Sequence, residues 1–217
     1  MDMDKDMDKK IARGLLSIGA VVVRPEEPFI WASGIKSPIY CDNRLTLTAP
    51  EIRTEIENCL AAVIRQHFPG CEVIMGTSTA GIAHAAIVGH IMGLPMGYVR
   101  AGAKEHGRKN QIEGKLEKGA KVVVIEDLIS TAGSVLDVVE ILRGAGALVL
   151  GIASIFTYNM QKGIDRLKEA KVINHSLTNL DVLTQVAADE GVIAKSDIQR
   201  VLSFRDNPSD ESWIKRG

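Results

Sequence analysis

The sequence predicts an α/β protein with a central parallel sheet covered by helices. Short unbroken apolar runs, such as residues 122–125, alternate along the chain with amphipathic helical patterns. Strands that are buried on both faces of a parallel sheet read as such continuous apolar runs. The length of 217 residues, with 46% hydrophobic and 24% charged residues, suits one compact globular unit rather than two full domains. No internal repeat or Ser/Pro-rich linker divides it.

The first 45 residues break the α/β rhythm. Short extended pieces are expected at residues 21–24, 29–31 and 39–40, because prolines and Gly34 punctuate this stretch. They would form a flap beside the sheet. Residues 1–10 alternate acidic residues, methionine and lysine, and are expected to be a solvated start to the chain.

From residue 46 onward the α/β pattern is regular. A helix is expected over residues 49–68, where apolar residues recur at steps of three and four and Pro50 stands in the first turn. Strands are then expected at residues 71–75, 96–99, 121–125 and 148–156, with helices at 82–92 and 134–144. Two more helices are expected at 180–188 and 196–204, the second opened by a capping box at residues 196–199.

Composition excludes several classes of protein. With 26 Lys and Arg against 27 Asp and Glu, the net charge of −1 provides no basic field to attract nucleic acid. Three cysteines without a CxxC pair predict neither a disulfide framework nor a zinc site, and they fit a reducing compartment. No apolar run approaches the roughly 18 residues of a membrane span. We therefore expect a cytoplasmic protein with no membrane partner.

The clearest candidate site follows the expected strand at 121–125. Two carboxylates, Glu126 and Asp127, precede a run of small and hydroxylated residues that leads directly into a helix. The backbone N–H groups of residues 131–134, at a helix N-terminus, would suit one phosphate group. The carboxylates would repel a phosphate, so they suit neighbouring hydroxyls, as in ribose 5-phosphate. The alternative interpretation of so short a motif, which is less favoured, is a plain helix cap and a solvated strand end.

Two other loops are unusual. Residues 76–81, Gly-Thr-Ser-Thr-Ala-Gly, form a small hydroxyl-rich turn between an expected strand and helix, compatible with a second anion site or with turn geometry alone. Residues 100–114 form a long polar segment with five potential cations and three glycines. Such a segment is either a solvated basic loop or a lid that closes over a polyphosphate.

These segments resemble a known family. Residues 122–134 resemble the phosphoribosyl diphosphate (PRPP) signature of the type I phosphoribosyltransferases. Residues 31–44 and the lid segment resemble the orotate phosphoribosyltransferases within that family, in the same order. The resemblance implies a type I fold with a five-stranded parallel core at residues 46–217 and an N-terminal hood at residues 1–45.

The resemblance also implies a function. A glycosyltransferase (pentosyltransferase) of this family moves ribose 5-phosphate from PRPP to N1 of orotate with Mg²⁺ as cofactor. The products are orotidine 5′-monophosphate and pyrophosphate, in the biosynthesis of pyrimidine nucleotides and UMP. The partners implied are PRPP, orotate and a second copy of the chain, with the lids shared across a homodimer.

Roles for individual residues follow from the same resemblance. PRPP is expected to contact Arg100, Lys104, His106, Glu126, Asp127, Leu128, Ile129, Ser130, Thr131, Ala132, Gly133 and Ser134. Orotate is expected to contact Ser130, with Arg44 or Lys36 facing its carboxylate. The expected catalytic residues are Lys104, His106 and Asp127. Magnesium is expected to be held mainly by PRPP, with no direct ligand from the protein.

The chain departs from the family pattern at several basic positions. Some members have lysines where this chain has Ala32, Ala80 and Ala101-Gly102, and an arginine near Asn159. Two other functions stay open: a purine phosphoribosyltransferase, which would replace the hood, and a PRPP-sensing regulator, which would need no lid. Residues 31–44 and the lid segment favour the orotate enzyme.

Overall fold

The computed structural model describes residues 3–31, 33–100, 102 and 111–214. The helices are α1 (Met3–Ser17), α2 (Pro50–His67), α3 (Ala80–Met92), α4 (Gly133–Gly144), α5 (Gln161–Glu169), α6 (Leu180–Asp189) and α7 (Ile198–Asp206). The strands are β1 (Val21–Val23), β2 (Phe29–Ile30), β3 (Lys36–Ser37), β4 (Ile39–Cys41), β5 (Val73–Thr77), β6 (Met96–Val99), β7 (Ile112–Glu113), β8 (Lys121–Ile129), β9 (Leu148–Thr157) and β10 (Asn174–Asn179). Short 3-10 helices occupy Asn43–Thr48, Lys195–Asp197 and Ser212–Ile214.

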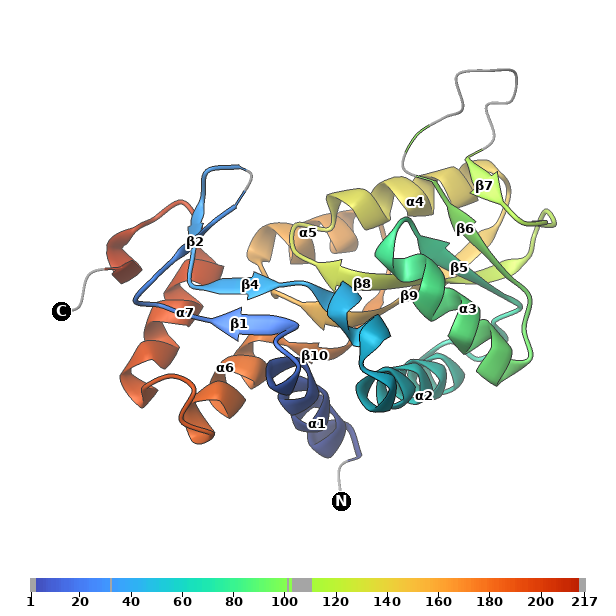
Figure 1. Cartoon of the computed structure of the whole chain (residues 1–217). Coiled ribbons are helices and arrows are strands. Elements are labelled where there is room, and N and C mark those ends of the chain that lie inside the picture. The colour runs from blue at the N-terminus through green and yellow to red at the C-terminus, as the bar shows by residue number, and fades with distance from the viewer. Residues whose placement is uncertain (1–2, 32, 101, 103–110, 215–217) are drawn as a thin grey trace.

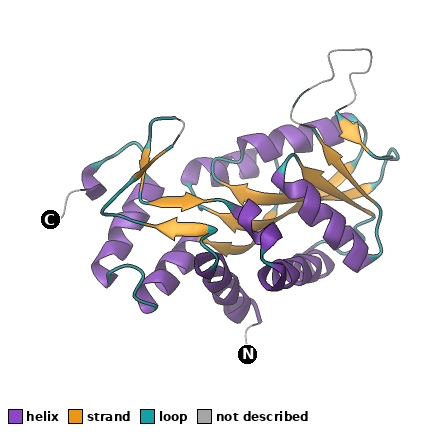
Figure 2. Cartoon of the chain, viewed as in Figure 1, coloured by secondary structure: helices purple, strands orange, loops and turns teal. Residues whose placement is uncertain are grey.

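The core is a six-stranded sheet in the order β10-β9-β8-β5-β6-β7. Its first five strands are parallel, and β7 pairs antiparallel with β6 at the edge. Helices cover both faces of the sheet, with α4 and α5 on one side and α2 and α3 on the other (Figures 1 and 2). The predicted α/β class and five parallel strands are confirmed. The carboxyl ends of β5 and β8 therefore lie side by side at one edge.

The central strand β8 separates two apolar cores. Val123 and Ile125 pack on the side of α2 and α3, whereas Val122 and Val124 pack on the side of α4. All four side chains are fully buried. This is why the strand reads as an unbroken apolar run rather than as an alternating one.

The start of the chain differs from the prediction. Residues 3–17 form α1 rather than a solvated segment, and this helix packs against α6 and β10. Ile11 and Leu15 are buried and Met7 packs against the same core, so the apolar residues recur at every fourth position. The alternation of acidic residues with methionine and lysine over residues 1–10 obscured this helical period.

The predicted extended pieces are confirmed, and they contact the end of the chain. Strands β1 and β4 form one antiparallel pair, and β2 and β3 form another. Trp31, after β2, stacks edge-on against Tyr158 and Phe204, with ring centroids 5.6 and 5.5 Å away. Arg200 of α7 donates hydrogen bonds to the carbonyl oxygens of Pro25 and Trp213. The N-terminal segment is therefore held in place by α7 and by Tyr158.

Three local expectations were incomplete or wrong. Helix α5 and strand β10 were not expected, because their sequences are mostly polar. Strand β8 continues to Ile129 instead of ending at residue 125. The capping box at residues 196–199 does not form: Asp197 is the N-cap residue and makes no side-chain cap bond. Its carboxylate accepts a hydrogen bond of 2.7 Å from Arg200 instead.

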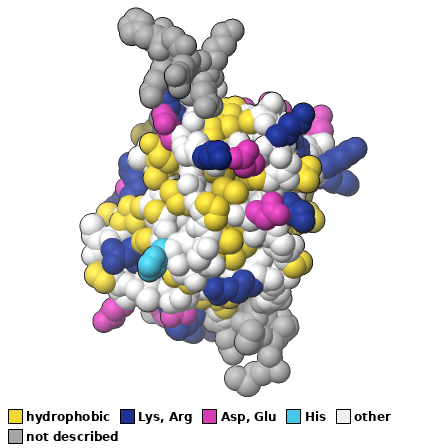
Figure 3. All heavy atoms as spheres, turned by 90° about the vertical axis from the view of Figure 1, so that its right-hand side faces the viewer, with side chains coloured by type: hydrophobic (Ala, Val, Ile, Leu, Met, Phe, Trp, Pro, Cys, Tyr) yellow, Lys and Arg dark blue, Asp and Glu magenta, His cyan; other side chains and the backbone are white. Residues whose placement is uncertain are grey.

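The surface is mixed in charge on the face that Figure 3 shows. Basic and acidic side chains are interspersed there with apolar atoms, rather than gathered by sign. Within the described residues, no helix has the length and apolar character needed to cross a bilayer.

Helix α1 should contribute measurably to stability. Leu15 is fully buried between α1 and the rest of the core, so Leu15→Ala should lower the free energy of unfolding by about 3 kcal/mol. Leu148→Ala is a matched control, because Leu148 is 55% exposed and should change stability by less than about 1 kcal/mol. Urea denaturation followed by circular dichroism measures both. Equal effects would mean that α1 does not pack firmly on the core.

Candidate active site

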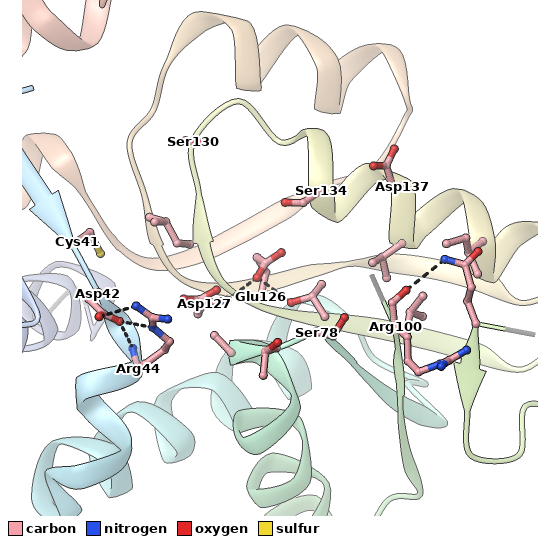
Figure 4. Close-up of a pocket in the computed structure, with 18 residues that line it drawn as sticks. Cys41, Asp42, Arg44, Ser78, Arg100, Glu126, Asp127, Ser130, Ser134 and Asp137 are labelled. Atoms are coloured by element: carbon pink, nitrogen blue, oxygen red, sulfur yellow. Dashed lines mark hydrogen bonds and ion pairs between the residues drawn. The ribbon is translucent and has the colours of Figure 1, made fainter. Parts of the chain in front are cut away.

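A cavity of about 790 Å³ opens at the carboxyl ends of β5 and β8 (Figure 4). This volume is in the range of small-molecule sites. Of the residues expected from the sequence, the cavity is lined by Arg44, Arg100, Glu126, Asp127, Leu128, Ser130 and Ser134. Residues 77–80 of the second unusual loop line it as well. The edge of the sheet thus brings together both strand-to-helix turns.

The carboxyl group of Glu126 is buried at this edge. Its Oε1 atom accepts a hydrogen bond of 2.7 Å from the Thr77 hydroxyl and one of 3.0 Å from the Asp127 N–H. Burial, and next the neighbouring Asp127 carboxylate, raises the pKa of Glu126 to about 8. At neutral pH the pair formed by Glu126 and Asp127 therefore retains one proton on Glu126.

The turn after β5 is packed directly against β8. A Cβ atom on Gly81 would lie 2.5 Å from Thr77 Oγ1 and 2.6 Å from the carbonyl oxygen of Ile125. A Cβ atom on Gly76 would lie 2.8 Å from the Gly81 carbonyl oxygen. Both glycines are needed for this approach, which brings the Thr77 hydroxyl to Glu126. The turn contains a cis peptide bond between Ser78 and Thr79.

The loop from β8 to α4 is only three residues long, because β8 extends to Ile129. Ala132 adopts a left-handed backbone conformation with φ of 59° and turns the chain into the helix. Within the part of the chain that the structure describes, the N–H groups of residues 131–134 donate to no carbonyl or side chain. Ser130 and Ser134 line the cavity beside them. Unpaired N–H groups at a helix N-terminus suit an anion.

The other expected members of this loop take different positions. Ile129 is buried in the core on the side of α4. Thr131, Ala132 and Gly133 do not line the cavity. Any contact they make with an anion would come from their backbone N–H groups.

Asn43 joins the N-terminal segment to β8, the strand that carries Glu126 and Asp127. The Asn43 side chain is buried, and its Nδ2 atom donates a hydrogen bond of 2.6 Å to the Asp127 carbonyl oxygen. Its Oδ1 atom accepts from the thiol of Cys41, which lines the cavity. This contact fixes the position of residues 41–44 relative to β8.

Arg44 lies at the mouth of the cavity and forms a forked ion pair with Asp42. Its Nε and Nη2 atoms lie 2.6 and 2.8 Å from the two Asp42 carboxylate oxygens. The guanidinium group holds the pKa of Asp42 below its usual value. Because the Arg44 side chain is 65% exposed, this fork can turn to a carboxylate on a ligand.

The other basic residues that the sequence predicts in the site differ in their positions. Arg100 lines the cavity and pairs with Glu113 of β7 at 3.2 Å. Lys36 does not line the cavity, and its Nζ atom lies 2.8 Å from Glu211. Lys104 and His106 lie outside the described residues, so of the three expected catalytic residues the structure places only Asp127.

Some family members have lysine or arginine at positions where this chain has other residues, and only some of these positions line a cavity. Ala80 lines the cavity, whereas Ala32 and Ala101 lie outside the described residues. Asn159 lines a neighbouring cavity of about 310 Å³ and donates from Nδ2 to Asp181 at 3.3 Å. It has a positive φ of 54°, which asparagine tolerates better than most residues.

Four polar residues of the cavity were not predicted from the sequence: Cys41, Asp42, Gln111 and Asp137. Two of them carried a signal. Asp137 follows Ser134 by three residues and so shares its face of α4. Asp42 stands two residues before Arg44, which is within reach of a local ion pair.

Comparison with known proteins decides the family. The model of the phosphoribosyl transferase domain matches residues 46–189. An orotate phosphoribosyltransferase of Bacillus anthracis (strain CDC 684 / NRRL 3495) is 56% identical over 96% of this chain and 99% of its own length. This chain belongs to the orotate phosphoribosyltransferase family. A member from Bacillus cereus (strain B4264) is likewise 56% identical over 96% of this chain and 99% of its own.

Solved structures agree with the orotate phosphoribosyltransferase family. The enzyme of that name from Aeropyrum pernix superposes with a TM-score of 0.73 at 28% identity, over 85% of this chain and 99% of that one. Leishmania donovani UMP synthase superposes with a TM-score of 0.77 at 26% identity, over 91% of this chain and 42% of that one. The predicted type I phosphoribosyltransferase fold is confirmed.

The buried carboxyl of Glu126 should make stability depend on pH. From about pH 5 to about pH 8 the folded protein holds a proton on Glu126 that the unfolded chain has released, so this group lowers stability as pH rises. Glu126→Gln removes the titration. The free energy of unfolding of the variant minus that of the unchanged protein should therefore rise with pH, by up to about 1.4 kcal/mol per pH unit.

Urea denaturation at several pH values measures this difference. Glu140→Gln is the control for replacing a glutamate by a glutamine, because Glu140 is exposed on α4 and does not line the cavity at Glu126. If the difference in free energy of unfolding between Glu126→Gln and the unchanged protein does not change with pH, Glu126 is ionised in the folded protein.

Proposed function

We propose that this chain is an orotate phosphoribosyltransferase that moves ribose 5-phosphate from PRPP to N1 of orotate. The observation that carries the proposal is that one cavity is lined by the Glu126–Asp127 pair and by Ser130 and Ser134, which flank the segment with unpaired N–H groups. A sugar phosphate needs both features: donors for its phosphate and carboxylates for its hydroxyls. The products would be orotidine 5′-monophosphate and pyrophosphate, as in pyrimidine nucleotide biosynthesis.

The order of groups along the cavity supports this assignment. In Figure 4 Asp42 and Arg44 lie at one end, Glu126 and Asp127 in the middle, and Arg100 at the other end. Orotate, ribose and pyrophosphate are joined in that order during the transfer. We propose that Arg44 and Ser130 contact orotate, the carboxylates contact ribose, and Arg100 contacts pyrophosphate.

Between the two cations proposed for the orotate carboxylate, the structure favours Arg44. Arg44 lines the cavity and presents a planar fork, which matches a carboxylate. Orotate would then replace the Asp42 carboxylate as its partner. Lys36 remains the second candidate, but its contact with Glu211 directs it away from the cavity lining.

The carboxylates have a role in the transition state. As the bond from the anomeric carbon to pyrophosphate breaks, positive charge develops on the ribose ring. Asp127 lies at the cavity wall and is fixed through its backbone by Asn43, so its charge is in place before the reaction begins. Preorganised charge of this kind stabilises a transition state without reorganisation.

Magnesium suits this site as cofactor. The Asp127 carboxylate and the Glu126 carboxyl group offer oxygen ligands, the kind that Mg²⁺ prefers, and they would hold the ion through the ribose hydroxyls or through water. Most other ligands would come from PRPP. When bound, the ion would take up charge on the pyrophosphate leaving group.

The proposal also includes a lid over the pyrophosphate, an N-terminal hood, a homodimer and a cytoplasmic location. Lys104 and His106 would close over pyrophosphate, and Arg100 stands at the base of that segment. Residues 1–45 would form the hood over the orotate end. Two copies would share lids as a homodimer. The three free cysteine thiols support a cytoplasmic location, since disulfides are rare there.

An absorbance assay with PRPP and Mg²⁺ tests the substrate. We expect turnover of orotate and none of uracil, adenine or hypoxanthine, because only orotate carries a carboxylate for the Arg44 fork. Omission of Mg²⁺ is the control for the cofactor. Turnover of hypoxanthine or uracil without orotate would overturn the assignment.

Asp127→Asn should lower kcat by on the order of 10²-fold, because it removes a preorganised charge at the reacting ribose without changing side-chain size. Steady-state kinetics measures the loss, and circular dichroism checks that the fold is retained. Asp189→Asn, on the exposed end of α6, is the control and should leave kcat unchanged. Activity within twofold of the unchanged enzyme would make Asp127 a strand-end residue only.

Shared lids make a separate prediction for Lys104→Ala. Its kcat should fall far more than its affinity for PRPP, because a lid contact forms mainly in the transition state. Mixing inactive Lys104→Ala with inactive Asp127→Asn subunits should restore activity, since one hybrid site then has both an intact lid and an intact carboxylate. No recovery in confirmed heterodimers would show that each lid serves its own subunit.

A further inference from the structure

We infer that Arg166 of α5 is a positioning residue that holds the loop of residues 130–132 in its anion-binding conformation. The inference rests on the proposed function, because it concerns the group that this loop would bind. Arg166 lies 35 residues after the loop and on its far side from the cavity. Neither the motif nor the lining of the cavity includes it.

The contact is direct. Nη1 of Arg166 donates a hydrogen bond of 3.2 Å to the carbonyl oxygen of Thr131. The guanidinium group also lies against the start of α4, since a Cβ atom on Gly133 would be 3.3 Å from the same nitrogen. Arg166 and Gly133 line a separate groove of about 480 Å³ between α4 and α5. Arg166 therefore acts on the loop from behind.

The same side of the loop is closed by the backbone of α5. A Cβ atom on Gly163 would lie 2.5 Å from the carbonyl oxygen of Ser130. The carbonyl groups of Ser130 and Thr131 thus both face α5, one against Gly163 and the other against Arg166. The glycine is required because any side chain would push the loop away.

Peptide geometry converts this contact into an effect on the site. In a trans peptide unit the C=O and N–H bonds point in opposite directions. With the Ser130 and Thr131 carbonyls turned to α5, the N–H groups of Thr131 and Ala132 point away from α5, toward the cavity side. These are two of the N–H groups for which the described residues offer no partner.

The loop also needs an external restraint. Ala132 has a φ of 59°, a conformation that is unfavourable for any residue with a Cβ atom. A hydrogen bond from a charged donor to the preceding carbonyl offsets this cost, because charged donors bind more strongly than neutral ones. The positive charge behind the loop also favours an anion in front of it.

The test compares two ligands that would occupy different ends of the cavity. Arg166→Ala should raise the inhibition constant of ribose 5-phosphate about tenfold, the effect of losing one charged hydrogen bond. The inhibition constant of pyrophosphate should not change. The KM for PRPP should rise while kcat stays within about threefold, since the phosphate contact is uniform between ground and transition states.

The matched control is Arg143→Ala. Arg143 lines the same groove and donates to the carbonyl oxygens of Ala170 and Lys171, at 2.8 and 3.3 Å, but it does not contact the loop. It should leave both inhibition constants unchanged. Equal effects of the two variants on ribose 5-phosphate would overturn the inference, as would an equal weakening of ribose 5-phosphate and pyrophosphate by Arg166→Ala.

A second variant keeps the inference testable if Arg166→Ala fails to fold. Gly163→Ala presses on the same loop at the Ser130 carbonyl and should weaken ribose 5-phosphate selectively. Gly144→Ala is its control, because a Cβ atom there meets no neighbour within 4 Å. Turnover of orotate by the unchanged protein decides the proposed function separately. An active unchanged enzyme, with Gly163→Ala at normal ribose 5-phosphate affinity, would refute the positioning role alone.

Discussion

The buried carboxyl group of Glu126 is the constraint on which the site depends. A carboxyl group removed from water is costly unless it is hydrogen-bonded or protonated. Here the Thr77 hydroxyl and the Asp127 N–H both reach one of its oxygens, and its raised pKa keeps a proton at neutral pH. Thr77 can reach it only because β5 and β8 are neighbours and because Gly76 and Gly81 let the turn pack closely.

Segments from four parts of the chain are fixed around that carboxyl group. Asn43 ties the N-terminal segment to the backbone of Asp127, and the start of α4 presents unpaired N–H groups beside it. Arg100 enters from the end of β6, where pairing with β7 holds its backbone. Glu126 and Asp127 therefore occupy the middle of the cavity, and Arg44 and Arg100 lie at its two ends (Figure 4). A ligand with a polyhydroxylated centre and anionic ends is complementary to this arrangement.

The anion loop is supported from outside the cavity. Helix α5 closes the space behind residues 130–132 through the Gly163 backbone and the Arg166 guanidinium. Helix α5 is mostly polar and has a glycine in its first turn, which lowers its helix propensity. Both features are explained by contact with the loop. A residue larger than Gly163 would collide with the Ser130 carbonyl, and an apolar residue in place of Arg166 could not donate to the Thr131 carbonyl. At Gly163, the low helix propensity of glycine conflicts with the contact to the loop, and the contact determines which residue is present.

The sequence by itself determined the α/β class, most strands and helices, and the succession of a carboxylate pair and a short loop before a helix, because these depend on local periodicity and contiguous motifs. It did not reveal α1, whose first residues are mostly charged, or the true end of β8, where carboxylates continue a strand. Only the tertiary structure showed that Asn43, Thr77 and Arg166 converge on residues 126–131. These contacts join residues 35 to 84 positions apart, and strand order and packing, not local pattern, bring such residues together.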